Sequence, residues 1–225
     1  MGLMRICFIG DSYVNGTGDD ACLGWAGRLC AEGRQLGADI TLYNLGVRGD
    51  TTAEIAERWQ RESAMRLAPE HDGRLIFSFG VNDCIATDQG CTRVPEADSI
   101  ANARSILSSA GAWLPTLMIG PPPTAEPELN RRVEHLSAGL NTLCHDLSVP
   151  FLSLWEYLSN NEIWMREVAS RDGAHPNSAG YRVLADHVAR WSAWRSWMAD
   201  AVSSKSLNQQ AGSRGINDGP SEAAR

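Results

Sequence analysis

Short apolar runs alternate along the chain with longer amphipathic segments. The apolar runs, which predict strands, cover residues 4–9, 40–45, 75–79, 115–119 and 151–154. The amphipathic segments, which predict helices, cover residues 25–36, 51–67, 97–113, 129–147 and about 177–198. Strands that alternate with helices favour right-handed βαβ units and a mostly parallel sheet. We therefore predict an α/β protein, a three-layer α/β/α sandwich with helices on both faces of the sheet.

Local signals mark the ends of several predicted helices. Thr51 and Glu54 fit a capping box, in which each side chain binds the backbone N–H of the other residue. Gly37 is a suitable C-cap for the helix before it. Asn177 or Ser178 is a suitable N-cap for the last helix.

The composition changes after Ala201, where Ser, Gly, Asn and Gln predominate. Such a segment has too little apolar surface to offset the entropy lost on ordering. We predict one domain over residues 1–201 and a disordered tail over residues 202–225. A chain of this length can bury a core of the ordinary size for one domain.

Composition and charge exclude several classes of function. The chain has 43% hydrophobic and 21% charged residues, which is typical of a soluble globular protein. Its formal net charge of −7 and its lack of a basic cluster argue against a nucleic-acid partner. No apolar run approaches the ~20 residues of a membrane span, and the first residues resemble a core strand more than a signal peptide.

Six scattered cysteines are best interpreted as reduced thiols, which together with these features predicts a cytoplasmic location. There is no Cys-x-x-Cys and no His-Glu-x-x-His motif, so the sequence predicts no metal site and no cofactor.

Three predicted strands end in residues that suit acyl transfer. The first leads into Asp11-Ser12, the second reaches Gly46, and the third is followed by Asn82-Asp83. Ligands of open α/β sheets bind at the carboxyl ends of the strands, so these groups are expected to meet at one edge. Ser12 is the candidate nucleophile. The backbone amides of Ser12 and Gly46 and the side-chain amide of Asn82 are candidate oxyanion donors, with Asp11 and Asp83 supporting their turns.

Asp172 and His175 provide an acid and a base close together near the other end of the chain. On a tight loop, the Asp172 carboxylate can reach one nitrogen of the His175 ring while the other nitrogen faces Ser12. Pro176 favours an extended backbone at His175, just before the last predicted helix. His175 is the candidate base and Asp172 the acid that orients it.

Each of these residues also has a purely structural interpretation. Ser12 can cap a turn, Gly46 can end a strand, and Asn82 can form an Asx-turn. A surface histidine after a turn aspartate is likewise common. The functional interpretation is favoured because three successive strand ends carry the required groups in order.

Two other motifs do not fit their usual functions. The run from Gly16 to Gly18 superficially matches a dinucleotide-binding fingerprint, but Asp19 and Asp20 would repel a pyrophosphate. A Gly-x-Ser-x-Gly elbow is absent because Val14 occupies the position of the second glycine, which argues against the α/β-hydrolase fold.

Four segments, residues 8–13, 44–46, 80–83 and 172–175, resemble the four ordered blocks of the SGNH (GDSL) lipase/esterase superfamily. The resemblance implies a flavodoxin-like fold with a five-stranded parallel sheet. It also implies a triad of Ser12, Asp172 and His175. The implied oxyanion hole consists of Ser12, Gly46 and Asn82. Tyr13 stands where the family name has Leu, a difference expected to affect the shape of the pocket.

The function expected from these residues is hydrolysis of a small-molecule carboxylic ester through an acyl-enzyme. The same groups would serve a carbohydrate O-deacetylase, a thioesterase or an acyltransferase. A non-catalytic binding module on the same scaffold is the alternative from another class, and a homo-oligomer is possible. Four carboxylates in loops near the expected mouth suggest a preference for neutral over anionic esters. They are Asp19, Asp20, Asp50 and Asp83.

Overall fold

The computed structural model describes residues 3–214, with side chains described as far as residue 203. The strands are β1 (Met4–Gly10), β2 (Ile40–Gly46), β3 (Asp72–Ser78), β4 (Thr116–Ile119) and β5 (Phe151–Leu152). The longer helices are α2 (Gly24–Gln35), α3 (Thr52–Ala64), α4 (Glu96–Trp113), α5 (Pro127–Asp146), α8 (Ser178–Arg190) and α9 (Ser192–Arg214). The shorter helices are α1 (Ser12–Asn15), α6 (Trp155–Ser159) and α7 (Glu162–Ala169).

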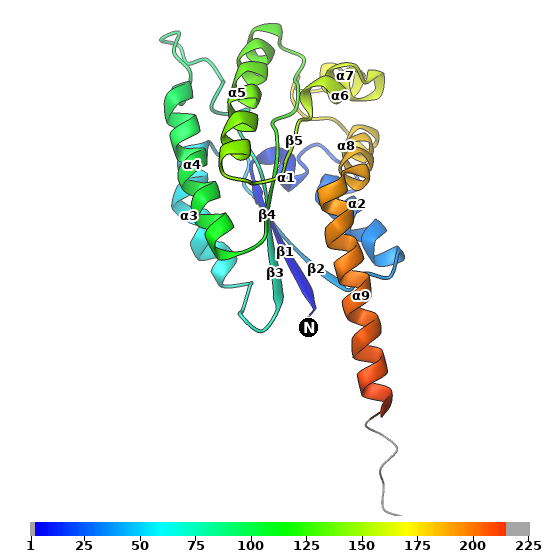
Figure 1. Cartoon of the computed structure of the whole chain (residues 1–225). Helices are drawn as coiled ribbons and strands as arrows, with labels where there is room; N and C mark the ends of the chain where they lie inside the picture. Colours follow the sequence, from blue (N-terminus) through cyan, green and yellow to red (C-terminus); the bar gives the residue numbers. More distant parts are fainter. Residues whose placement is uncertain (1–2, 215–225) are drawn as a thin grey trace, which may run out of the picture.

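The five strands form one parallel sheet in the order β2-β1-β3-β4-β5. Helices α3, α4 and α5 lie on one side of the sheet, and α2, α8 and α9 lie on the other (Figure 1). The predicted three-layer sandwich with a flavodoxin-like sheet is therefore confirmed. All strands point the same way, so their carboxyl ends meet at one edge of the sheet.

Aromatic residues from the two helical layers pack against the central strands. Phe8 of β1 and Phe77 of β3 are fully buried. Trp25 of α2 meets the Phe8 ring edge-on at 5.3 Å between centroids, and Trp59 of α3 meets Phe77 at 5.4 Å. Burial on both faces explains why these strands are almost continuously apolar in the sequence.

Several helix boundaries follow the sequence, while others differ. The capping box of Thr51 and Glu54 is present at the start of α3. The predicted helix over residues 177–198 is wrong at Trp191, whose extended backbone (φ −68°, ψ 131°) separates α8 from α9. Helices α1, α6 and α7 were not predicted, because segments of four to eight residues are too short to show a helical period.

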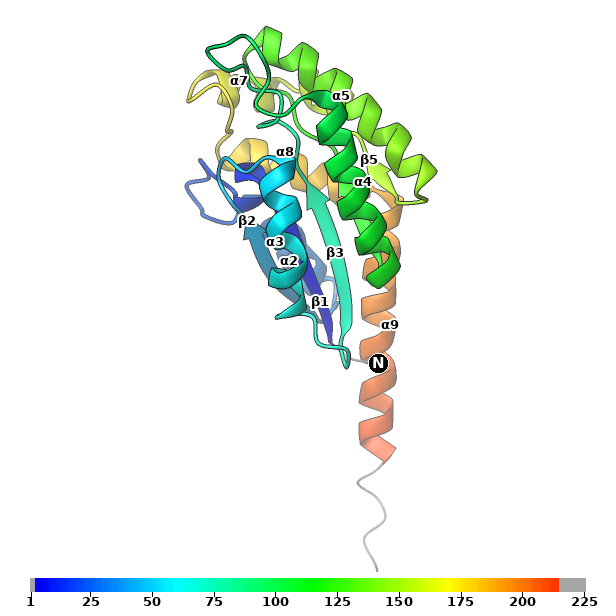
Figure 2. The ribbon, with the colours of Figure 1, turned by 90° about the vertical axis from the view of Figure 1, so that its left-hand side faces the viewer.

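Helix α9 continues to Arg214, beyond residue 201 where the predicted domain ends. It extends past the amino ends of the strands, as the two views together show (Figures 1 and 2). The segment predicted to be a disordered tail, residues 202–225, thus begins within a helix, and residues 215–225 lie outside the described residues.

All six cysteines are free thiols in the described part of the chain. Between residues 3 and 214, no helix combines the length and the apolar character needed to cross a membrane.

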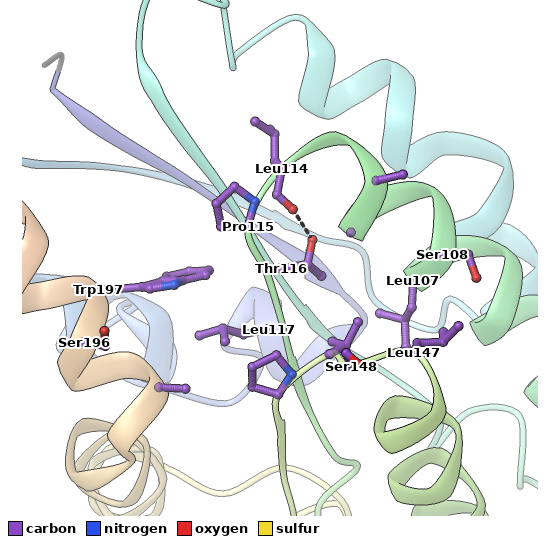
Figure 3. A pocket seen from close by; sticks show the side chains of 15 residues that line it. Leu107, Ser108, Leu114, Pro115, Thr116, Leu117, Leu147, Ser148, Ser196 and Trp197 are labelled. Carbon is purple, nitrogen blue, oxygen red and sulfur yellow. Dashed lines mark hydrogen bonds between the residues drawn. The ribbon is translucent and has the colours of Figure 1, made fainter.

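A cavity of about 610 Å³ lies at the amino-terminal end of the sheet, between the start of β4, the end of α4 and Trp197 of α9 (Figure 3). The described residues that line it include hydroxyl groups, such as those of Ser108 and Thr116, but no acid, histidine or cysteine. It therefore lacks a group for proton transfer at neutral pH. The candidate chemical groups lie at the opposite end of the sheet.

Candidate active site

Ser12 is presented at the point where β1 ends and α1 begins. The Asp11 side chain caps α1 by accepting the Tyr13 backbone N–H at 3.0 Å. Residue 10 must be glycine because a Cβ there would lie 1.9 Å from the carbonyl oxygen of Ser78 in the neighbouring strand β3. Ser12 is only 3% exposed, so its hydroxyl is held within the protein and away from bulk water.

The structure brings Ser12, His175 and Asp172 into one hydrogen-bonded chain. The His175 Nε2 atom lies 2.7 Å from Ser12 Oγ, and His175 Nδ1 lies 2.7 Å from Asp172 Oδ2. The other Asp172 oxygen accepts the backbone N–H groups of His175 at 2.8 Å and Ala174 at 3.0 Å. These bonds fix the carboxylate and the ring relative to each other, as sequence analysis predicted from their spacing.

The Asp172 carboxylate is strongly acidic. Partial burial alone would raise its pKa, but the hydrogen bonds from His175 and Ala174 outweigh burial and lower the pKa to about 2. The Arg48 guanidinium lies 4.0 Å from Asp172 Oδ2 at the exposed side. Asp172 is therefore ionised throughout the neutral pH range and suits stabilisation of a charged imidazole.

Gly46 lies directly beside the Ser12 turn. A Cβ on Gly46 would lie 2.2 Å from the Asn15 backbone nitrogen, so only glycine permits this close approach of β2 to α1. The Gly46 N–H, however, donates to Asn44 Oδ1 at 3.0 Å. Sequence analysis predicted the position of Gly46 but did not anticipate that its amide is bound to a neighbouring side chain.

Asn82 also reaches the Ser12 turn. Its Nδ2 atom donates to the Asp50 carbonyl oxygen at 2.9 Å and lies 3.4 Å from Asp11 Oδ2. The first bond anchors the amide, while the second is long and weak. The hydrogen directed toward Asp11 is therefore the one available to a substrate oxygen.

Asp83 lies behind Asn82 and joins the starts of two helices. Its carboxylate is buried and accepts the Thr52 backbone N–H at 2.8 Å and the Thr52 hydroxyl at 2.6 Å. It also accepts the Ser99 hydroxyl at 2.6 Å. These bonds fix the turn that carries Asn82 against α3 and α4.

A family comparison covers the part of the chain that carries this arrangement. A family model described as the GDSL-like Lipase/Acylhydrolase family matches residues 8–183, which include all the candidate residues. The chain belongs to this family.

Individual relatives are distant but similar over most of their length. GDSL lipase Rv0518 of Mycobacterium tuberculosis is 29% identical over 204 residues, which cover 83% of this chain and 80% of the relative. The crystal structure of a lipase/acylhydrolase from Enterococcus faecalis has a TM-score of 0.71 at 22% identity, over 85% of this chain and 96% of that chain. Axe2, an acetylxylan esterase from Geobacillus stearothermophilus, has a TM-score of 0.65 at 17% identity, over 86% and 98%.

In this GDSL-family chain, sequence analysis expected four free carboxylates near the entrance to the site. For three of the four, the expectation of a free carboxylate is wrong. Asp19 is buried in an ion pair with Arg28, and Asp83 is buried among hydroxyl groups. Asp50 lies 2.7 Å from Arg58 Nε. Asp20 is the exposed member of the set. Burial and ion pairs thus leave less free negative charge near the site than the sequence suggested, and the preference for neutral esters stays a prediction.

The loop after α1 is bound to the segment around His175, which the sequence did not indicate. Asp19 Oδ1 accepts the Ser178 hydroxyl at the start of α8. The Tyr181 hydroxyl donates to the Thr17 carbonyl oxygen at 2.7 Å. These contacts join residues about 160 positions apart in the sequence, where no local pattern could identify the partner. They join the loop that follows α1 to the first turn of α8.

Asp11 is a buried carboxyl group with a high pKa. Burial is the main cause and outweighs the Tyr13 hydrogen bond, so the pKa of Asp11 is about 7. The charges of Asp83 and Asp50 add to the increase. A carboxyl group with a higher pKa in the folded than in the unfolded state stabilises the fold at low pH and loses this contribution as the pH rises.

We expect Asp11→Asn to remove this pH dependence. The melting temperature of the variant minus that of the unaltered protein should rise between about pH 4 and pH 7 and then level off. Thermal unfolding at pH 4.5, 6 and 7.5 measures the difference. A difference that stays constant over this range would contradict a raised pKa at Asp11.

Proposed function

We propose that the chain is a serine esterase that hydrolyses carboxylic esters through an acyl-enzyme. The observation that carries the proposal is the continuous chain of two 2.7 Å contacts from Asp172 through His175 to Ser12. A serine hydroxyl becomes an effective nucleophile when an adjacent base removes its proton. A third group that orients the base completes the arrangement.

In the proposed reaction, Ser12 Oγ attacks the ester carbonyl carbon while His175 Nε2 takes the hydroxyl proton. Asp172 stabilises the resulting imidazolium through Nδ1. The tetrahedral intermediate then collapses, and His175 returns the proton to the leaving alcohol. Water, deprotonated by His175, attacks the carbonyl carbon of the acyl-Ser12 ester, and the second tetrahedral intermediate collapses as His175 returns the proton to Ser12 Oγ and the acid is released.

The proposed oxyanion donors are the Ser12 backbone N–H and the Asn82 amide, with Gly46 as the third. Donors aimed at the developing oxyanion contribute most when they are already held in place. Asn82 meets this condition through its bond to the Asp50 carbonyl oxygen. Gly46 would contribute by sharing its N–H between Asn44 and the substrate.

Acetyl esters of carbohydrates are the first natural substrates to test, because a similar structure belongs to an acetylxylan esterase. Thioester hydrolysis and acyl transfer to an alcohol would use the same residues and make different products. Short-chain nitrophenyl esters test the step that all these reactions share, which is transfer of the acyl group to Ser12. They do so whichever leaving group or acyl acceptor the natural reaction uses.

The proposal is tested by labelling with a fluorophosphonate probe together with turnover of nitrophenyl acetate. We expect one covalent adduct per chain, mapped by peptide mass spectrometry to Ser12, and hydrolysis that the probe abolishes. Acetylated xylo-oligosaccharide, an acyl thioester, and an ester with a competing alcohol then identify the acyl acceptor and leaving group. A folded protein that neither reacts with the probe nor hydrolyses the ester would refute the proposal and favour a binding module.

A further inference from the structure

Tyr13 connects the segment that carries Ser12 to the segment that carries His175. It follows Ser12 in α1 and is 2% exposed, so its phenol ring lies inside the protein. Sequence analysis expected residue 13 to affect the shape of the substrate pocket. The structure places its side chain against the loop of His175.

The Tyr13 hydroxyl donates to the Ala174 carbonyl oxygen at 2.9 Å. Ala174 directly precedes His175, and its own N–H donates to Asp172 Oδ1 at 3.0 Å. Residue 174 is thus held on both sides, by the carboxylate through its N–H and by the phenol through its C=O. The backbone from which the His175 ring extends has little freedom to move.

The Tyr13 ring also contacts the His175 ring itself. Their centroids lie 5.1 Å apart at an interplanar angle of 37°. The Trp164 ring of α7 also lies 6.3 Å from the Tyr13 ring at 24°, and Trp164 Nε1 donates to the Pro123 carbonyl oxygen at 3.0 Å. The Tyr13 ring therefore packs against a buried indole that is itself hydrogen-bonded, which restricts movement of the phenol ring.

We propose that Tyr13 is a positioning residue that holds the His175 ring at hydrogen-bonding distance from Ser12 Oγ. The inference rests on the proposed esterase function but assigns a role to a residue outside the Ser12–His175–Asp172 chain. Tyr13 touches no reacting atom, and it acts through the Ala174 carbonyl group and the face of the imidazole. Reactions of this type lose about 100-fold in rate when a group is misplaced by about 1 Å.

Two substitutions separate the contributions of the hydroxyl and the ring. Tyr13→Phe removes the bond to Ala174 and keeps the ring, and we expect kcat to fall about 10-fold, which corresponds to one hydrogen bond. Tyr13→Leu removes both, and we expect a fall of about 100-fold. KM for nitrophenyl acetate should change by less than about twofold in either variant, because neither contact is made to substrate.

Tyr181→Phe is the matched control. The Tyr181 hydroxyl also donates to a backbone carbonyl group, that of Thr17, and its ring packs edge-on against Trp164. The change in chemistry and burial is therefore similar, but the acceptor of the lost bond is Thr17 and not the residue next to His175. We expect kcat of Tyr181→Phe to stay within about twofold of the unaltered protein.

Proton NMR of the histidine rings provides a readout that needs no substrate. The His175 signals are assigned by their loss in His175→Gln. They should move in Tyr13→Leu, which lacks the neighbouring aromatic ring, and should move much less in Tyr13→Phe. If the unaltered protein hydrolyses no ester, the proposed function fails, while these signals still test the Tyr13–His175 contact.

The proposal is overturned if kcat falls equally in Tyr13→Phe and Tyr181→Phe, since loosening of the fold would then explain both losses. Unmoved His175 signals in folded Tyr13→Leu would also overturn it. If Tyr13→Leu does not fold, Tyr13→Phe retains the ring and decides the question: a kcat equal to that of the unaltered protein overturns the role of the hydroxyl.

Discussion

Replacement of Ser12 by alanine is expected to lower kcat for ester hydrolysis by about 10⁶-fold. Ser12 Oγ is the proposed nucleophile, and its removal leaves His175 Nε2 without the hydroxyl that it faces at 2.7 Å. A water molecule in place of the hydroxyl lacks the covalent attachment that holds the nucleophile against the substrate. Slow hydrolysis supported by the oxyanion donors and by binding alone should remain.

Steady-state hydrolysis of nitrophenyl acetate measures this loss, and Ser137→Ala is the control. Ser137 is a buried serine of α5, so its substitution removes a similar hydroxyl outside the candidate site. Ser12→Ala should unfold at a temperature close to that of the unaltered protein, because it loses one hydrogen bond worth about 1 kcal/mol. A folded Ser12→Ala variant that keeps more than about a tenth of the activity would exclude Ser12 as nucleophile.

The edge of the sheet that carries the site could be predicted because parallel strands obey a simple rule. The apolar runs predicted the positions of β1, β2 and β3. Because neighbouring strands of a parallel sheet point the same way, their carboxyl ends lie at the same edge. Ser12, Gly46 and Asn82 follow those ends, so the prediction of their common location needed no knowledge of side-chain contacts. The structure confirms the order and direction of the strands on which this argument depended.

The partners of individual polar groups could not be predicted in the same way. Hydrophobic periodicity reports which face of an element is buried, but it does not identify the group that a buried donor meets. The sequence therefore did not indicate that the Gly46 N–H binds Asn44, or that Asp19 is buried beside Arg28. Tyr13 illustrates the same limit, because its partner Ala174 lies 161 positions away.

The places where backbone segments approach each other closely can, in contrast, be recognised in the sequence by their glycines. Gly10 and Gly46 are paired across β1 and β2, and a Cβ on either would lie within 2.2 Å of a backbone atom. Two strands that both end in glycine therefore indicate a place where chain segments crowd together. Crowding of this kind keeps the Ser12 turn and the candidate oxyanion donors within one small volume.

Replacement of Asp172 by asparagine is expected to lower kcat by about 10⁴-fold while leaving the fold intact. Asn Oδ1 can still accept the N–H groups of Ala174 and His175, which now bind Asp172 Oδ1. The amide nitrogen then occupies the place of Oδ2 and donates to His175 Nδ1. The ring proton must move to Nε2, so the nitrogen that faces Ser12 can no longer accept the hydroxyl proton.

The control for this variant is Asp146→Asn, which makes the same change at the end of α5. The Asp146 side chain is 54% exposed and that of Asp172 is 47% exposed, so the two variants lose a carboxylate of similar accessibility. Asp172→Asn should lose activity in kcat with little change in KM at pH 7.5, whereas Asp146→Asn should lose none. Activity of Asp172→Asn within tenfold of the unaltered protein would mean that the ring keeps its tautomer without the carboxylate.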